Sequence, residues 1–204
     1  MRSTPMSSLK DSIALLESDL KTDPPRISVY HDLPFAILRY NPTDEWELRQ
    51  ETKLLATRLE AVGKMVHMLP MSELLWGALA KVSQQDEDEG FEAVVALEKE
   101  RGYLEAQQQV TTYLSNRVWV PLWDFLADRL AGINPENSVV FLTRVAAMSP
   151  GIFQVSMLLD KLHGKTKVPT ILCYPGSIEG TTGLRFMDLK DRDALGNYRV
   201  KIYG

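Results

Sequence analysis

Ser138-Val139-Val140-Phe141-Leu142 and Thr170-Ile171-Leu172-Cys173-Tyr174 decide the fold. Both are short, apolar and rich in β-branched residues, which is typical of strands that are buried on both faces. Between them lies a helical pattern that opens at Ser149-Pro150 and points Ile152, Val155, Leu159 and Leu162 inward. A strand, a helix and a strand in this order predict two parallel strands that are joined by a right-handed crossover.

The same alternation extends toward the N-terminus. A capping-box pattern at Ser8 opens a first helix, and Phe35 to Tyr40 and Lys64 to Leu69 have strand composition. Further helices are expected in the segments that follow, including one long helical region from about Phe91 to Leu114. Arg199 to Tyr203 alternates and is short and charged, as edge strands are. The sum predicts an α/β fold: an open, mostly parallel sheet of about four or five strands, flanked by helices.

Size and composition favour one globular domain. With 204 residues and 45% hydrophobic content, the chain can bury a substantial core, and we expect residues 1–204 to form a single domain. Cys173 is the single cysteine, so no internal disulfide can form. Without a run of about 20 apolar residues, or an apolar stretch after Met1, the chain is expected to be cytoplasmic and to have no contact with membrane.

Charge is unevenly distributed along the chain. Residues 161–204 hold 8 Lys/Arg and 4 Asp/Glu, a net charge of +4, whereas the whole chain has −4, so residues 1–160 carry −8. This asymmetry fits an oriented interface, and it equally fits charges that are scattered over a solvated surface. The overall negative charge gives no general attraction to nucleic acid.

His163-Gly164-Lys165-Thr166 looks like the end of a phosphate-binding P-loop. A P-loop, however, needs a glycine five positions earlier, where this chain has Leu159, and it must start a helix instead of following one. The strand 138–142 also ends in Thr143-Arg144 and lacks the acidic magnesium ligand of an NTPase. We therefore expect Gly164 to cap a helix, and we predict no nucleotide hydrolysis.

Other catalytic patterns are also missing from the sequence. His31, His67 and His163 are not spaced as metal ligands, and no zinc signature or Gly-x-Ser-x-Gly elbow occurs. Cys173 has no histidine or cationic neighbour in the sequence that could activate it. The sequence thus predicts a protein that is not an enzyme, with no catalytic residues, no metal and no cofactor.

The loop from Pro175 to Phe186 is the strongest candidate for a functional site, because ligands of open α/β sheets bind beyond the carboxyl ends of strands. Backbone amides, hydroxyls and one guanidinium could bind a partner or an anion there. Alternatively, the glycines only allow a tight loop. The candidate residues in this loop are Gly176, Glu179, Gly180, Thr181, Thr182, Gly183 and Arg185.

Trp119 and Trp123, which lie around Pro121, form a second candidate surface. Exposed tryptophans often anchor protein interfaces, whereas core packing is their commoner fate.

Four segments taken together carry a family resemblance: Arg26–Ile37, Lys53–Leu59, Lys165–Leu172 and Gly176–Lys201. They closely resemble the BrxB family of bacteriophage exclusion (BREX) systems, over nearly the whole chain from about Leu9 to Tyr203. The resemblance implies a bacterial component of antiviral defence. Such systems pair methylation of host DNA with restriction of phage DNA, and use a methyltransferase, large ATPases and the alkaline-phosphatase-like protein PglZ. It implies no catalytic residues.

The leading hypothesis is a non-catalytic assembly or adaptor subunit of a BREX complex that acts through protein–protein interaction, with PglZ as its direct partner and the other components nearby. One alternative is a degenerate nucleotide- or anion-binding domain. Another is a DNA-binding subunit that uses the basic residues 161–204, although four acidic residues are interleaved with them: Glu179, Asp188, Asp191 and Asp193. A homodimer that pairs residues 199–203 is compatible with the pattern.

Overall fold

The computed structural model describes residues 8–27, 33–179, 183–189 and 200–204. The chain divides into two compact units, and each contains segments that are distant in the sequence. Unit 1 comprises Met1–Met68, Asn134–Thr143 and Lys167–Gly204, and unit 2 comprises Leu69–Ile133 and Arg144–Thr166. Within the described ranges, no helix is both long enough and apolar enough to cross a bilayer.

A single six-stranded sheet dominates unit 1, which contains all of it except the last two residues of β2. Its strands are β1 (Phe35–Tyr40), β2 (Met65–Pro70), β3 (Ser138–Thr143), β4 (Thr170–Glu179), β5 (Gly183–Phe186) and β6 (Lys201–Tyr203). The strand order is β2-β3-β4-β1-β6, and β5 pairs with β4 outside this path. β4 is parallel to both β3 and β1, and β6 is parallel to β1. The predicted α/β fold with a mostly parallel open sheet is confirmed.

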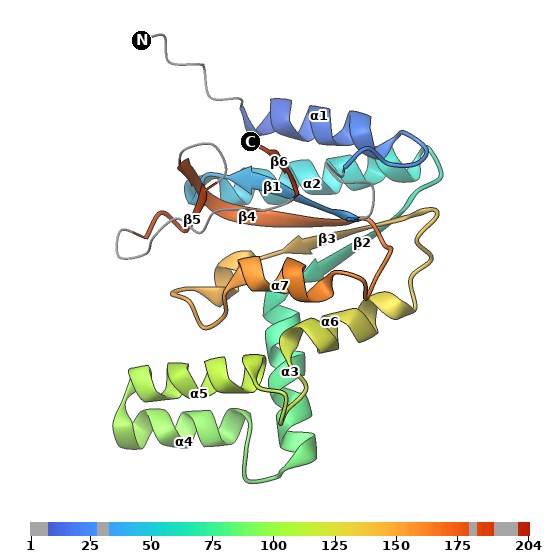
Figure 1. Cartoon of the computed structure of the whole chain (residues 1–204). Helices are drawn as coiled ribbons and strands as arrows, with labels where there is room; N and C mark the ends of the chain where they lie inside the picture. The colour runs from blue at the N-terminus through green and yellow to red at the C-terminus, as the bar shows by residue number, and fades with distance from the viewer. Residues whose placement is uncertain (1–7, 28–32, 180–182, 190–199) are drawn as a thin grey trace. The chain divides into compact units, whose positions relative to one another are not determined.

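Two helices cover one face of this sheet, α1 (Leu9–Leu20) and α2 (Glu45–Glu60), and they lie side by side in Figure 1. Ser8 caps α1 in the predicted capping box: its side chain accepts from the Asp11 amide, and the Asp11 carboxylate accepts from the Ser8 amide at 3.2 Å. α2 ends shortly before Gly63, which has a positive φ of 86°.

The core under these helices is built from alternate residues of the strands. Leu38, Phe141 and Cys173 are fully buried there against Leu16 and Leu55 of the two helices. Because successive strand residues point to opposite faces, only every second residue reaches this core. The residues between them are buried too, which explains why the strands read as continuous apolar runs.

Unit 2 is helical. It contains α3 (Met71–Gln85), α4 (Phe91–Arg101), α5 (Tyr103–Ser115), α6 (Leu122–Ala131), the 3₁₀-helix η2 (Val145–Met148) and α7 (Val155–Leu162). In Figure 1, α4 and α5 form an antiparallel hairpin beside the C-terminal half of α3. A small apolar core between α3 and α5 consists of Leu79, Val82 and Tyr113, and Trp119 packs against it.

The structure corrects three predicted elements. The helical region 91–114 is two helices, because Gly102 has a φ of 91° that no α-helix can contain. The helix expected from Ser149-Pro150 begins only at Val155, since Gly151 has a φ of 141°. The supposed loop after Tyr174 is mainly a hairpin, in which β4 continues to Glu179 and pairs with β5.

Candidate functional site

The carboxyl ends of β1 and β4 form the edge of the sheet where the sequence placed the site. The two strands are adjacent and in parallel register, with Arg39 opposite Tyr174 and Tyr40 opposite Pro175. β1 stops there, whereas β4 runs on for four more residues and is accompanied by β5. The predicted site residues therefore lie on a β-hairpin that extends beyond the end of β1.

Gly176 allows this hairpin to close. Its φ is 150°, and a Cβ atom at this position would lie 1.9 Å from the carbonyl oxygen of Arg185 on the opposite strand. Any other residue would therefore push the two strands apart. Next to it, the rings of Tyr174 and Phe186 pack edge to face with a centroid distance of 5.6 Å. The Met187 amide donates to the carbonyl oxygen of Pro175 at 2.9 Å.

Two charged candidates, Glu179 and Arg185, form an ion pair across the hairpin. The Arg185 side chain is one-quarter exposed, and its Nε atom is buried without a hydrogen-bond partner among the described residues. Ile178, which precedes Glu179 in β4 and lies opposite Leu184, is 39% exposed. Because successive strand residues point to opposite faces, the hairpin carries Ile178 on one face and the Glu179–Arg185 pair on the other.

The hairpin brings together four of the seven predicted loop residues: Gly176, Glu179, Gly183 and Arg185. Gly183 lies opposite Glu179 in the β ladder. Gly180, Thr181 and Thr182 lie outside the described residues. The backbone of the four described residues belongs to an antiparallel strand pair.

The other two candidates, Trp119 and Trp123, lie in unit 2. Trp123 is only 5% exposed and packs against Phe153, with the Lys161 ammonium 5.8 Å from the centre of its indole ring. Trp119 is half-buried and packs edge to face against Tyr113 at 5.5 Å. Both side chains contribute to the packing of unit 2, and they do not form an exposed pair.

A cavity of about 290 Å³ opens beside the end of β1, between the first turns of α1 and α2. Arg39 lines it together with Asp44 and Glu47, so its walls carry both signs of charge. The Arg39 Nε atom is buried and has no partner among the described residues. Because two carboxylates line the cavity with one guanidinium, its charge does not favour the binding of a polyphosphate. Sequence patterns gave no sign of this cavity, because its residues come from three separate elements.

Tyr40, which also lines this cavity, donates a hydrogen bond to Glu45 at the start of α2. Burial and the Glu45 carboxylate raise the pKa of the Tyr40 phenol far above its usual value. The phenol therefore stays neutral and links the end of β1 to α2 at every physiological pH.

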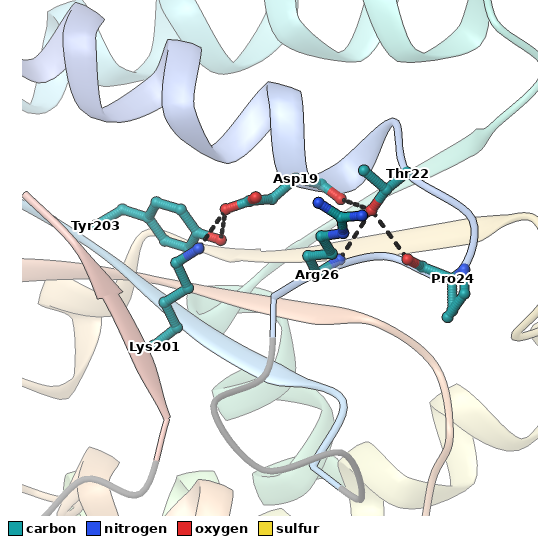
Figure 2. A network of polar contacts seen from close by, with 6 residues as sticks. All are labelled: Asp19, Thr22, Pro24, Arg26, Lys201 and Tyr203. Carbon is teal, nitrogen blue, oxygen red and sulfur yellow. Dashed lines mark hydrogen bonds and ion pairs between the residues drawn. The ribbon is translucent and has the colours of Figure 1, made fainter.

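A polar network fixes the edge strand β6 to α1 (Figure 2). The Asp19 carboxylate accepts from the Lys201 ammonium at 2.5 Å and from the Tyr203 phenol at 2.7 Å. The backbone carbonyl of Asp19 accepts from the Arg26 amide at 3.0 Å and from the Thr22 hydroxyl at 2.7 Å. Asp19, near the end of α1, thus binds both the segment that follows the helix and the edge strand β6. The network stabilises the fold.

Cys173 is fully buried in the core of unit 1. Burial, with a smaller contribution from the Glu45 carboxylate, raises the pKa of its thiol to about 12. A thiol in these surroundings is not a nucleophile at neutral pH. In the described ranges, no group of three or more His, Cys, Asp or Glu side chains is arranged to hold a metal ion.

The P-loop-like motif follows a helix, as predicted. α7 ends at Leu162, Gly164 has a φ of 75°, and the Lys165 amide donates to the Leu162 carbonyl at 2.9 Å. These are features of a helix C-cap. The Lys165 ammonium pairs with Asp124 of α6, so it is not directed toward a nest of backbone amides.

Sequence reasoning missed the most exposed aromatic contact of unit 2. Trp76 of α3 and Phe91 of α4 pack edge to face at 5.0 Å, although they are 54% and 40% exposed. A signal was available, because the buried residues Leu74, Ala78 and Val82 recur on one side of α3 and Trp76 falls on the other.

The comparisons with known proteins identify the family. A family model described as "BREX protein BrxB" matches residues 72–202, which is more than half of the chain. Neither the curated proteins nor the solved structures that were compared with the chain give a match. The matched region contains the hairpin and most of unit 2, and it ends within β6. The chain therefore belongs to the BrxB family of BREX proteins.

Proposed function

We propose that this protein is a non-catalytic assembly subunit of a BREX phage-defence complex, and that PglZ is its direct partner in the cytoplasm. The observation that carries the proposal is membership of the BrxB family, which implies a component of BREX and hence other BREX proteins as partners. The chemistry of the described residues supports an assembly role, since the thiol of Cys173 is sealed in the core and Lys165 belongs to a helix end.

The β4–β5 hairpin is the proposed docking element. It extends past the end of β1, and its conformation is fixed by Gly176, by the Glu179–Arg185 ion pair and by the Tyr174–Phe186 contact. A preorganised hairpin loses little entropy when it binds. Ile178 supplies exposed apolar area at its side, where a partner can cover it.

Co-purification tests the proposal. The tagged full chain is co-expressed with PglZ, and we expect PglZ to be retained at micromolar concentration. Ile178→Glu should lower the affinity about tenfold or more, because it places a charge in a desolvated contact. Leu54→Glu is the matched control, since Leu54 is also exposed (54%) but lies on α2, and it should leave the affinity unchanged.

The possible outcomes distinguish a wrong assembly role from a wrong choice of docking element. If the wild-type chain retains neither PglZ nor any other BREX component, the assembly role is wrong. If PglZ is retained equally by the wild type and by Ile178→Glu, the hairpin is the wrong surface although the role stands. Melting temperatures of both variants, measured in parallel, show whether a loss of binding reflects a loss of folding.

A further inference from the structure

The exposed Trp76–Phe91 pair lies next to the most acidic segment of the chain. Residues 86–105 contain 8 Asp/Glu and 2 Lys/Arg, a net charge of −6, whereas the whole chain has −4. The rest of the chain therefore carries +2. Phe91 follows directly on the acidic loop 86–90, opens α4 and contacts Trp76 in the second turn of α3, so the acidic loop leads directly into the aromatic pair.

The structure holds this loop in place. Gly90 lies so close to α3 that a Cβ atom would be 2.0 Å from the Ser83 hydroxyl, and the Ser83 hydroxyl donates to the Glu89 carbonyl at 3.0 Å. On the other side, the Tyr113 phenol of α5 donates to the Glu89 carboxylate and accepts from the Gly90 amide. Phe91 is thereby fixed against Trp76, and the contact is formed before any partner arrives.

Four carboxylates, in the loop before Phe91 and in the first turn of α4, are not neutralised. Asp86, Glu87, Asp88 and Glu92 are exposed, and within the part of the chain that the structure describes no Lys or Arg forms an ion pair with them. We call these four residues, together with Trp76 and Phe91, the arm surface. It combines a fixed aromatic contact with the negative charge of the loop that leads into it and of the first turn of α4.

We propose that the arm surface binds a protein segment that is rich in Lys and Arg and presents an apolar side chain to the Trp76–Phe91 pair. Two exposed aromatic rings in fixed contact supply apolar area with little loss of side-chain entropy, which is the pattern of an interface anchor. The carboxylates select the partner by charge, because they attract a basic segment and repel phosphate backbones and anionic lipid surfaces.

This binding is additional to the proposed assembly role, and it uses a surface in unit 2 instead of the hairpin in unit 1. It can be tested without any BREX component. The probe is an amphipathic Leu/Lys peptide of about 14 residues, the length at which isolated helices become stable. Its counterpart has Glu at every Lys position, and a duplex DNA serves as a third probe. Affinity for the full chain is measured by fluorescence anisotropy of labelled probes.

We expect the Leu/Lys peptide to bind, and the Leu/Glu peptide and the DNA to bind at least about tenfold more weakly. Trp76→Ala should lower the affinity for the Leu/Lys peptide about tenfold or more, the usual loss when an anchor is truncated. Trp46→Ala is the matched control, because Trp46 is 69% exposed and also lies beside an exposed carboxylate, Glu47, but on α2. It should leave the affinity unchanged.

Charge is tested separately. Glu87→Lys/Asp88→Lys should weaken binding at low salt, and Glu98→Lys/Glu100→Lys, at the other end of α4, should have a smaller effect. The difference should vanish at about 1 M salt, where the Debye length is ~3 Å. Trp76 and the four substituted carboxylates are exposed, so all variants should keep the melting temperature of the wild type.

Four results would overturn the proposal. These are equal binding of the Leu/Lys and Leu/Glu peptides, the same loss of affinity for Trp46→Ala as for Trp76→Ala, and tighter binding of DNA than of the Leu/Lys peptide. The fourth is self-association in sedimentation experiments that Trp76→Ala abolishes, which would make a second copy of the chain the occupant.

Discussion

Tyr203 of β6 donates a hydrogen bond of 2.7 Å to the Asp19 carboxylate at the end of α1. The two residues are 184 positions apart, and this bond, with that of Lys201, fixes the short edge strand β6 to the helix layer (Figure 2). A strand of three residues has few ladder hydrogen bonds of its own. Its position therefore depends on Asp19.

Removing the phenol should destabilise unit 1. Tyr203→Phe is expected to lower the free energy of unfolding by about 1.5–3 kcal/mol, the usual contribution of a hydrogen bond to a charged group. Tyr103→Phe is the matched control, since Tyr103 is 65% exposed, and it should change the free energy by less than about 0.5 kcal/mol. Denaturant titration followed by circular dichroism measures both. Equal effects of the two substitutions would contradict the role of the Asp19–Tyr203 bond.

The same carboxylate should make stability depend on pH. Partial burial raises the pKa of Asp19, but the hydrogen bonds from Lys201 and Tyr203 outweigh this and leave the pKa below its usual value. A carboxylate whose pKa is lowered in the folded state stabilises the protein at every pH above its unfolded-state pKa of about 3.9. This contribution is lost as the pH falls through the folded-state pKa. The difference in unfolding free energy between the wild type and Asp19→Asn should therefore be constant near neutral pH and shrink in acid. A constant difference throughout the acid range would contradict it.

The parallel strands could be predicted because local composition determines them. Phe35 to Tyr40 was found with its exact bounds, and 138–142 and 170–174 were each found as strands, since continuous apolar runs between turn signals have few other structures. The extension of β4 was missed, because Gly176 reads as a loop residue when only the local sequence is seen. Its close approach to Arg185 is a tertiary contact, and it gives this glycine a place in a strand.

The candidate site could be predicted only in part. The carboxyl end of β4 follows from the strand pattern, whereas the cavity beside Arg39 combines residues from β1, α1 and the start of α2. Trp123 was proposed as an interface residue because of its residue type, yet its position on the apolar side of α6 buries it. Burial of a large side chain depends on the helix face that it occupies, and residue type alone does not determine that face.

Gly90 should not tolerate a side chain. Gly90→Ala would place a Cβ atom 2.0 Å from the Ser83 hydroxyl and 3.0 Å from the backbone of α3, at a φ of 91°. We expect a loss of about 2 kcal/mol or more, because backbone atoms must move and the conformation is strained. Gly132→Ala is the control: Gly132 also follows a helix, with a φ of −86°, and a Cβ atom there would contact nothing. Equal melting temperatures of the two variants would show that the loop is not held as described.

Cys173 should be chemically silent in the folded protein. Because burial raises the pKa of its thiol to about 12, the reactive thiolate is scarce at neutral pH, and the closed core also keeps reagents away. Iodoacetamide at about pH 8 should leave the native protein unmodified and should label it fully in denaturant, as mass spectrometry would show. Rapid labelling of the native protein would contradict this, and it would reopen the question of a nucleophilic cysteine.

Substitution of Lys165 tests in cells whether the segment after α7 is only a helix end or also a nucleotide-binding site. In an active P-loop the lysine contacts the phosphates, and its removal abolishes function. Here the ammonium pairs with Asp124, and both side chains are about 40% exposed, so the pair contributes less than about 1 kcal/mol. Lys165→Ala should therefore leave both the melting temperature and phage protection nearly unchanged when it replaces the wild type in a complete BREX system. Asp124→Ala should behave in the same way, because it removes the other half of the pair.

Loss of protection by Lys165→Ala alone, in a protein that still folds, would contradict this prediction. It would show that the Lys165 ammonium binds a ligand. The degenerate nucleotide-binding domain would then be favoured over a purely structural role for this segment.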